Sequence, residues 1–243
     1  MNQKNSIEVV LSPRLFSNIS TKKPFVVVVA DVFRATTSIC AALDYGIKAI
    51  IPVKRIRHAR FLYRLGYLVA AERGGTKVKF ADLDNSALSF FKPEYKGKEI
   101  VYSTTNGTKA IRKARKETSH IAVGSFINLK ALSEWLIRQN KNVVILCAGW
   151  KNKVNMEDSL FAGALAELLI ESEKFDTDCD SAKMALDQWQ MAKSDILGYI
   201  DHSSHRNRLR NLVSDEVLKY TFKLNSSDVV PILKTYKIVP AKD

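Results

Sequence analysis

The sequence predicts an α/β protein with a layered α/β/α arrangement, a mostly parallel sheet and a helical C-terminal third. Two observations support this fold class. Continuous apolar runs such as Phe25–Ala30 are typical of strands that are buried on both faces, as in a parallel sheet. Between these runs, apolar residues recur at helical spacing, so strands and helices alternate through the first two thirds of the chain.

The strands follow from the apolar runs, taken in chain order. The last of them is a short closing strand that comes after the helical third. The predicted strands are residues 7–11, 25–30, 47–53, 67–71, 99–102, 120–123, 142–147 and 229–233.

The helices follow from periodicity and from stop signals. Ile39, Ala42 and Leu43 fall on one face of the first helix, and Gly46 ends it. The last four helices make up the C-terminal third. The predicted helices are residues 36–45, 54–65, 106–116, 129–139, 156–171, 180–189, 194–200, 206–212 and 215–224.

Length and composition indicate an ordinary enzyme of one domain. The 243 residues are enough to bury a full core, so we expect a single domain over residues 1–243, with a subdivision near 175 left open. No apolar run approaches the roughly 20 residues of a membrane span. The polar N-terminus has no apolar signal core, and the three cysteines form no CxxC pair. We therefore expect a cytoplasmic protein with no membrane association.

The net charge of +13 predicts an anionic partner. Three basic clusters, near residues 54–64, 109–116 and 205–210, have the spacing of solvated helix faces. The chain shows no nucleic-acid fold signature, so a small acidic molecule is the favoured partner. A non-catalytic protein that binds anions or nucleic acid remains the less favoured alternative.

Polar segments follow several predicted strands at the point where each strand ends. Asp31 and Arg34 come directly after residues 25–30, and Gly149 follows residues 142–147. Open α/β sheets bind ligands at the carboxyl ends of their strands, so these segments predict a pocket of charges, hydroxyls and backbone N–H groups. For Asp31 and Arg34 alone, a helix cap with a surface arginine is an equal alternative.

The segment Ser103–Thr108 is the clearest candidate anion cradle. Its hydroxyls donate hydrogen bonds, and we expect Asn106-Gly107 to adopt the positive φ that turns successive N–H groups inward. The following helix adds the positive end of its dipole. The segment is not a Walker A loop, and a turn with a capping threonine is the plainer alternative.

Acidic side chains in the same segments suit a magnesium ion. Glu72 and Arg73 precede a glycine turn, and Glu157 and Asp158 begin the helix after Gly149. Mg²⁺ prefers a few carboxylates together with phosphate oxygens of the substrate. A surface salt bridge at Glu72 and ordinary helix-dipole partners at residues 157–158 are the alternatives.

Taken together, these segments resemble the ComB-like 2-phosphosulfolactate phosphatases. The motifs occur in the order of that family, over roughly residues 7 to 235. They are Asp-Val-Phe-Arg-Ala-Thr-Thr-Ser-Ile (31–39), Glu-Arg-Gly-Gly (72–75), Asp82 with Asn85-Ser86, Ser-Thr-Thr-Asn-Gly-Thr-Lys-Ala (103–110), Gly-Ser-Phe-Ile-Asn (124–128), Cys-Ala-Gly (147–149), Glu157-Asp158, Ala162-Gly163, and the late Ser204-His205 and Asp215.

The resemblance implies a Mg²⁺-dependent hydrolase that converts 2-phospho-3-sulfolactate to 3-sulfolactate and phosphate, a step toward coenzyme M in methanogens. The chain departs from the family pattern at Asp84, at Ala87 and in the loop 150–153, which is usually richer in glycine. A phosphatase of another small phosphorylated hydroxy acid is therefore the second hypothesis. The tryptophans could lie in the core or in an interface, which leaves a homo-oligomer open.

The resemblance and the pocket chemistry together assign roles to particular residues. Asp31 is expected to be a Mg²⁺ ligand or the nucleophile, and the sequence leaves open whether a phospho-aspartate or direct attack by water is used. Arg34 and Arg73 are expected to clamp the anions, while Glu72 or Asp158 completes the metal shell or acts as base. The expected substrate-binding residues are Thr104, Thr105, Asn106, Gly107, Thr108, Ser125, Asn128 and Gly149.

Overall fold

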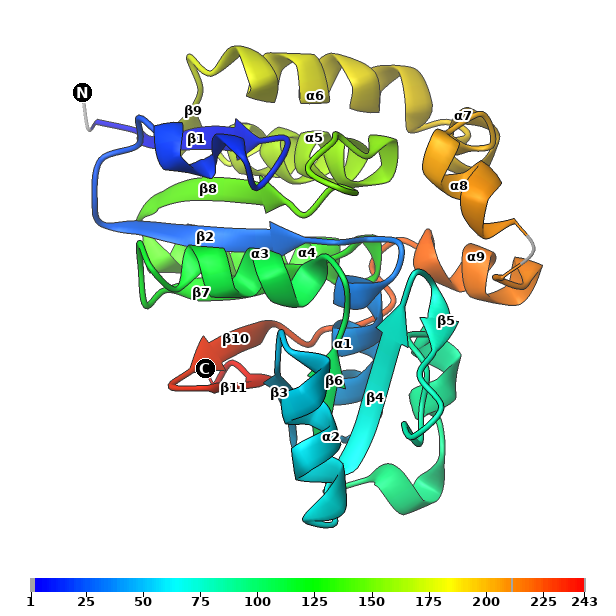
Figure 1. The fold of residues 1–243 in the computed structure, drawn as a ribbon. Coiled ribbons are helices and arrows are strands. Elements are labelled where there is room, and N and C mark those ends of the chain that lie inside the picture. The colour runs from blue at the N-terminus through cyan, green and yellow to red at the C-terminus, as the bar shows by residue number, and fades with distance from the viewer. Residues whose placement is uncertain (1–2, 211, 243) are drawn as a thin grey trace.

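One sheet runs through the whole computed structural model, which describes residues 3–210 and 212–242 (Figure 1). The order of its strands is β5-β4-β6-β3-β11-β10-β7-β2-β8-β1-β9. The first parallel group is β9-β1-β8-β2-β7. Its strands are β1 (Asn5–Val10), β2 (Phe25–Ala30), β7 (Ile121–Gly124), β8 (Asn142–Cys147) and β9 (Phe175–Asp176).

The second parallel group lies on the other side of a hairpin. It consists of β3 (Ala49–Pro52), β6 (Glu99–Ser103) and β4 (Leu68–Arg73), and β5 (Thr76–Lys77) pairs antiparallel to β4 at the edge. The hairpin of β10 (Pro231–Lys234) and β11 (Lys237–Pro240) is antiparallel to both neighbours, β7 and β3. Each pairing from β7 through β10 and β11 to β3 reverses the strand direction. The two parallel groups therefore run in opposite directions along the sheet.

The carboxyl ends of the two groups meet although the groups run in opposite directions. In Figure 1 the strands of the second group cross those of the first at a steep angle. A single residue pair joins β10 to β7, Ile232 with Ala122, and a single pair joins β11 to β3, Ile238 with Ile50. The sheet bends at this sparse junction, and the ends of β2, β4 and β6 come together beside α1.

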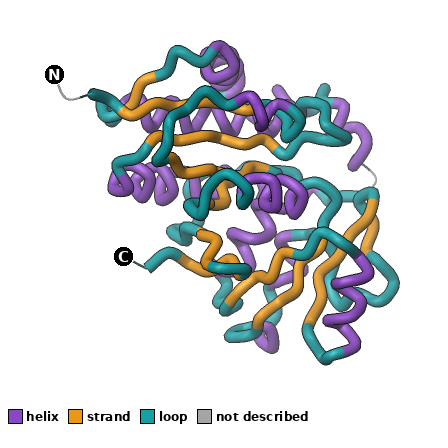
Figure 2. Tube along the Cα trace, turned by 60° about the vertical axis from the view of Figure 1, so that its left-hand side comes forward, coloured by secondary structure: helices purple, strands orange, loops and turns teal. Residues whose placement is uncertain are grey.

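The helices flank the strands, as Figure 2 shows by its colours. Their bounds are α1 (Ala35–Asp44), α2 (Ile56–Arg64), α3 (Gly107–Ala114), α4 (Leu129–Gln139), α5 (Met156–Glu171), α6 (Asp180–Ala192), α7 (Ile196–Ile200), α8 (Ser204–Leu209) and α9 (Asp215–Thr221). Short 3-10 turns are η1 (Leu15–Asn18), η2 (Ala87–Phe90), η3 (Pro93–Tyr95) and η4 (Phe126–Asn128).

Strand β2 is buried on both faces, as its sequence predicts. Alternate side chains enter two different clusters: Val27 and Val29 pack with α1 and α3, whereas Val26 and Val28 pack with α4 and α5. Burying such a side chain contributes about 1.5–3 kcal/mol, so β2 anchors both sides of the sheet. The helices on both faces fix the point at which β2 ends and Asp31 begins.

The predicted fold class, α/β with a mostly parallel sheet, is confirmed. The expected single closing strand over 229–233 is wrong in its extent, because the chain forms the hairpin β10–β11 there. Its turn places Thr235 at a φ of 55°. A β-branched residue rarely adopts that conformation, so the sequence carries no turn signal.

Smaller differences concern element ends. Strand β4 continues to Arg73, because Glu72 and Arg73 pair with β5. The predicted helix over 206–212 corresponds to α8, which begins at Ser204 and ends at Leu209, and residue 211 of that prediction lies outside the described residues. Within the described chain, no helix combines the length and apolar character needed to cross a membrane.

Candidate active site

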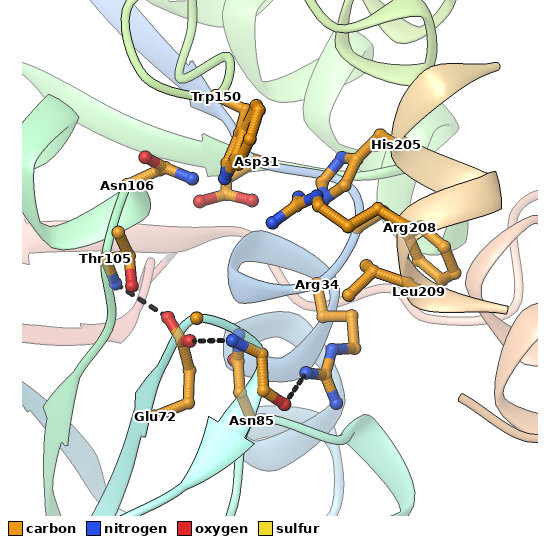
Figure 3. A pocket seen from close by; sticks show the side chains of 13 residues that line it. Asp31, Arg34, Glu72, Asn85, Thr105, Asn106, Trp150, His205, Arg208 and Leu209 are labelled. Atoms are coloured by element: carbon orange, nitrogen blue, oxygen red, sulfur yellow. Dashed lines mark hydrogen bonds between the residues drawn. The ribbon is translucent and has the colours of Figure 1, made fainter. Parts of the chain in front are cut away.

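A pocket lies where the ends of β2, β4 and β6 meet α8 (Figure 3). Of the residues predicted from the sequence, Asp31, Arg34, Glu72, Thr105 and Asn106 line it. The sequence analysis did not assign a site role to its other lining residues, which are Phe33, Gly74, Gly75, Asn85, Trp150, His205, Arg208 and Leu209.

Asp31 occupies the centre of this pocket in Figure 3. Its backbone N–H donates to Thr36 Oγ1 at 3.0 Å, and its carbonyl accepts from the Thr36 N–H at 2.8 Å, which fixes the turn from β2 into α1. The side chain is only 5% exposed. Burial raises the pKa of Asp31 to about 6; His205 lowers the pKa, while Glu72 and Glu157 raise it.

Glu72 ties three segments of the pocket together. Its Oε1 accepts the Thr105 N–H at 2.7 Å, and its Oε2 accepts the Gly75 N–H at 2.8 Å (Figure 3). The Gly75 carbonyl in turn accepts a hydrogen bond from Arg34 Nη2 at 2.8 Å. The end of β4, the loop after β6 and the start of α1 are thus held in one network of charge-assisted bonds.

Gly107 is required by a close approach. A Cβ at this position would lie 2.7 Å from Ala35 Cβ and 3.0 Å from Asp31 Oδ2. The expected positive φ at Asn106-Gly107 is wrong: Asn106 has a φ of −111°, and Gly107 begins α3 outside the positive-φ region. The glycine instead lets α3 come close to the Asp31 carboxylate.

His205 is held against the pocket by buried polar groups. Its Nδ1 contacts the Glu157 carboxylate and lies 3.0 Å from Asn155 Nδ2. All three side chains are buried, although they come from α8 and from the start of α5. Both contacts use Nδ1, so Nε2 is the ring nitrogen that Glu157 and Asn155 do not engage.

Arg208 reaches from α8 over the pocket toward Asp31 and Trp150 (Figure 3). Its guanidinium lies over the Trp150 ring, 4.1 Å from the centroid, which is a cation–π arrangement. Partial burial lowers the pKa of Arg208, whereas the charges of Glu157, Glu72 and Asp31 raise it. The pocket therefore sets cationic donors opposite a buried carboxylate.

Asp158 lies beneath the pocket and does not line it. Its Oδ1 accepts the Val32 N–H and its Oδ2 accepts the Gly149 N–H, each at 2.9 Å. Full burial raises the pKa of this carboxyl well above its ordinary value, and Glu157 and Asp31 raise it further. Within residues 3–210 and 212–242, no three or more His, Cys, Asp or Glu side chains form a group that could hold a metal. The structure thus does not gather Asp31, Glu72 and Asp158 into one metal shell.

The remaining predicted residues lie behind the pocket and bond to the protein. The Arg73 guanidinium donates to the Ser103 and Lys54 carbonyls, each at 3.1 Å. Thr108 Oγ1 donates to the Thr104 carbonyl at 2.8 Å, within the first turn of α3. The substrate-binding roles predicted for Thr104 and Thr108 stay predictions.

Three other predicted residues also make structural contacts. The Ser125 N–H donates to Asn128 Oδ1, and the Asn128 amide donates to the Val229 carbonyl, each at 3.0 Å. Gly149 has a φ of +57°, and a Cβ there would meet the Lys153 carbonyl oxygen at 2.1 Å. These contacts shape the loops that surround the pocket, and the ligand roles of the three residues stay predictions.

Sequence reasoning gave no site role to His205, Arg208 or Trp150. The late Ser204-His205 pair and the basic cluster near 205–210 were visible, but nothing local shows that α8 covers strand ends more than 100 residues earlier. Leu209 packs with Phe33 and Val213, and this apolar contact positions the helix. The weak signal in the sequence was His205, which comes two residues after Ser203, the polar residue that caps α8.

The fold and the pocket define an α/β protein with buried carboxylates and guanidinium groups gathered at the meeting strand ends. Over residues 10–236 the chain matches the family model described as 2-phosphosulpholactate phosphatase. A protein of Carboxydothermus hydrogenoformans named "Probable 2-phosphosulfolactate phosphatase" is 38% identical over 228 residues, which are 93% of this chain and 92% of that protein. One of the same name from Caldanaerobacter subterraneus subsp. tengcongensis is 33% identical over 221 residues, 89% of this chain and 91% of the relative. The chain therefore belongs to the 2-phosphosulfolactate phosphatase family of phosphoric monoester hydrolases.

Proposed function

We propose that the protein is a Mg²⁺-dependent phosphatase that hydrolyses 2-phospho-3-sulfolactate to 3-sulfolactate and phosphate. The observation that carries this proposal is the buried Asp31 carboxylate, set among cationic and N–H donors in the pocket of a chain from this family. Phosphomonoester hydrolysis is very slow without a catalyst, so the site must lower the barrier by about 20 kcal/mol. Preorganised charges of both signs are the plausible source of most of that reduction.

The residues present fit a magnesium ion. Burial raises the pKa of Asp31 to about 6, although its carboxylate has a backbone hydrogen bond with Ala35 and the charge of His205 nearby, so these protein groups compensate its negative charge only in part. Glu72 adds a second carboxylate to the pocket, although each of its oxygens already accepts one N–H. Mg²⁺ keeps several waters and needs only one or two protein carboxylates with phosphate oxygens, so a larger cluster is not required. When bound, the ion would supply Lewis-acid stabilisation of charge on the phosphoryl oxygens.

The phosphate is proposed to bind beside Asp31, against Asn106 at the start of α3. Asn106 lines this side of the pocket, and the eight residues of α3 begin directly after it with the positive end of the helix dipole. Arg34 lies on the adjacent side, and only one of its guanidinium nitrogens donates to Gly75 among residues 3–210 and 212–242, so the others are proposed to bind the phosphate. These groups neutralise the phosphoryl oxygens before a nucleophile approaches.

His205 is proposed to protonate the leaving oxygen. During hydrolysis the bond from the attacking oxygen to phosphorus forms, the bond from phosphorus to the C2 oxygen breaks, and that oxygen takes up a proton. When Glu157 holds the Nδ1 proton, the imidazolium form of His205 carries a second proton on Nε2, which it can donate to this oxygen. The neutral imidazole that results takes a proton back from the water that attacks phosphorus, so the step balances. The attacking oxygen belongs either to water or to Asp31, and the configuration at a chiral phosphorus distinguishes the two. One displacement by water inverts it, whereas two successive displacements through a phospho-aspartate retain it.

The decisive experiment is phosphate release from synthetic 2-phospho-3-sulfolactate, with Mg²⁺ and with EDTA, beside 2-phospholactate. The expected result is rapid release that EDTA abolishes and that falls sharply when the sulfonate is missing. Equal release from both compounds would keep a phosphatase but remove the sulfonate from its substrate. No release from either compound would overturn the proposal.

A further inference from the structure

We propose that Arg208, stacked on Trp150, binds the sulfonate of the substrate and sets the specificity of the pocket for a second anionic group. This inference rests on the proposed function, because it names the part of that substrate which the phosphate-binding side of the pocket does not engage. It concerns the side of the pocket that α8 and the loop after β8 provide.

The first argument is that Arg208 has no anionic or carbonyl partner. Within residues 3–210 and 212–242, its guanidinium makes no hydrogen bond or salt bridge with the protein. Its neighbours differ in this respect: Arg206 approaches Asp201 and Asp215, and Arg210 donates to Asp201 at 3.0 Å. A partly buried guanidinium without such a partner is well suited to receive an anion from outside.

The second argument is that Trp150 orients the guanidinium. The ring centroid lies 4.1 Å from Arg208 Cζ on one side, and Lys151 Nζ lies 4.5 Å from the same centroid. Cation–π contact uses the flat face of the guanidinium and leaves the N–H groups at its edge for hydrogen bonds. A planar fork of donors matches two oxygens of a sulfonate, so the stack prepares a bidentate contact.

The third argument is the position of Arg208 relative to the phosphate side. In Figure 3 Asn106 and Thr105 lie on one side of Asp31, and Arg208 approaches Asp31 from the opposite side. A substrate whose phosphate lies against Asn106 and α3 therefore presents its other end to Arg208. The phosphorylated carbon of 2-phospho-3-sulfolactate is flanked by two anionic groups, the carboxylate and the sulfonate-bearing carbon, so the substrates in the test below are chosen to tell these two groups apart.

The fourth argument is charge balance. The negative charges of Asp31, Glu72 and Glu157 lie close enough to Arg208 to raise its pKa. None of these three carboxylates forms an ion pair with it. A bound sulfonate would give Arg208 an oxyanion partner at short range without drawing it onto the catalytic carboxylate.

The test compares Arg208→Gln with the wild type on three substrates. These are 2-phospho-3-sulfolactate, 2-phospholactate, which keeps the carboxylate and lacks the sulfonate, and 2-sulfoethyl phosphate, which keeps the sulfonate and lacks the carboxylate. For the two sulfonates we expect kcat/KM to fall about 30-fold, mainly through KM, because a charge-assisted contact is lost. For 2-phospholactate the expected change is less than about 3-fold.

Matched variants separate specificity from charge and folding. Arg210→Gln removes one positive charge from the exposed residue just after α8 and should leave the substrate ratio unchanged. Trp150→Phe keeps an aromatic face and should reduce the preference for sulfonates less than Trp150→Ala does. An equal loss on all three substrates in Arg208→Gln, or a loss confined to the carboxylate compounds, would overturn the assignment.

Binding of the product 3-sulfolactate, measured by calorimetry, keeps the proposal testable without turnover. Weaker binding by Arg208→Gln than by the wild type supports the sulfonate site, even if the wild type releases no phosphate and the proposed function fails. Equal binding by the two proteins would overturn the sulfonate site while leaving the phosphatase activity intact. The two hypotheses therefore fail on different measurements.

Discussion

One side of the pocket consists of strand ends and the other of the short helix α8, and the two hold their polar side chains in different ways. On the strand side, Glu72 is fixed through backbone N–H groups of Thr105 and Gly75, and Asp31 by the turn into α1. On the helix side, His205 is fixed by another side chain, Glu157, and Arg208 by an aromatic face. We call these the strand wall and the helix wall.

The difference indicates a division of work between the walls. Backbone bonds cannot shift without moving the segments that carry them, so the strand wall is suited to hold the proposed metal and phosphate in fixed positions. The helix wall depends on apolar contacts of Leu209 with Phe33 and on side-chain partners, so substitutions there can change specificity without disturbing the sheet. The following predictions test this division, from the largest expected effect to the smallest.

Replacing Asp31 by Asn should abolish the function of the strand wall. We expect kcat/KM to fall more than about 1,000-fold, because the buried charge that is proposed to face the metal and the phosphate is lost. Phosphate release measures activity, and circular dichroism should show an unchanged fold. Asp178→Asn removes an exposed carboxylate and is the control. Near-normal turnover in Asp31→Asn would remove Asp31 from the site.

Replacing His205 by Gln should affect the helix wall in a way that depends on the leaving group. We expect kcat to fall about 100-fold on an alkyl phosphate, since the leaving oxygen then lacks its proton donor. With p-nitrophenyl phosphate the leaving group needs no proton, so the loss should nearly disappear. A similar loss on both compounds would assign His205 a structural role.

The stability of the metal-free protein should fall with rising pH because of Asp31. A carboxyl with a folded pKa of about 6 and an ordinary value of 3.8 binds more protons folded than unfolded between these pH values. This carboxyl contributes up to about 3 kcal/mol to the free energy of unfolding. The contribution is fully present below about pH 4 and is lost as the pH rises through 6. Urea unfolding in EDTA at pH 4.5 and 7.5 measures this.

Two variants serve as references for the pH prediction. Asp31→Asn should lack this part of the pH dependence. In His205→Gln the loss of stability should occur at higher pH, because His205 on the helix wall lowers the pKa of Asp31 on the strand wall. An identical pH dependence in wild type and Asp31→Asn would contradict the prediction.

Replacing Glu72 by Gln should cost stability more than any substitution at Arg208. One carboxylate oxygen becomes an NH₂ group that faces a backbone N–H, either of Thr105 or of Gly75. We expect a loss of about 1–3 kcal/mol in the free energy of unfolding, the cost of an unsatisfied buried donor. Urea titration of Glu72→Gln and Arg208→Gln side by side checks the order. If the two variants were equally stable, the proposal that the two walls hold their polar side chains in different ways would be wrong.

The strand wall was largely predictable and the helix wall was not. The run Phe25–Ala30 and the carboxylate after it are a local pattern, and α4 and α5 have the predicted bounds, since periodicity and stop signals act over a few residues. The approach of His205 to Glu157 depends on packing between segments 48 residues apart, for which one sequence offers no signal.

The close packing at Gly107 escaped prediction for a related reason. The sequence shows a glycine where a turn is expected, and conformational freedom is the usual explanation for it. The actual constraint is the distance to Ala35, which belongs to another helix. Spatial neighbours of this kind appear only once α1 and α3 are both in place.

The hairpin β10–β11 has a consequence for how the chain folds. In the described part of the chain, β10 and β11 come after all other strands of the sheet in sequence. Within the same residues, they alone connect the two parallel groups by strand pairing. Each group can form its own ladder during synthesis, but the continuous sheet requires contacts with residues 231–240. Such long-range closure is slow, so joining of the two halves should be the late step of folding. A newly made chain would thus form the strands on both sides of the pocket before the hairpin joins the two parallel groups.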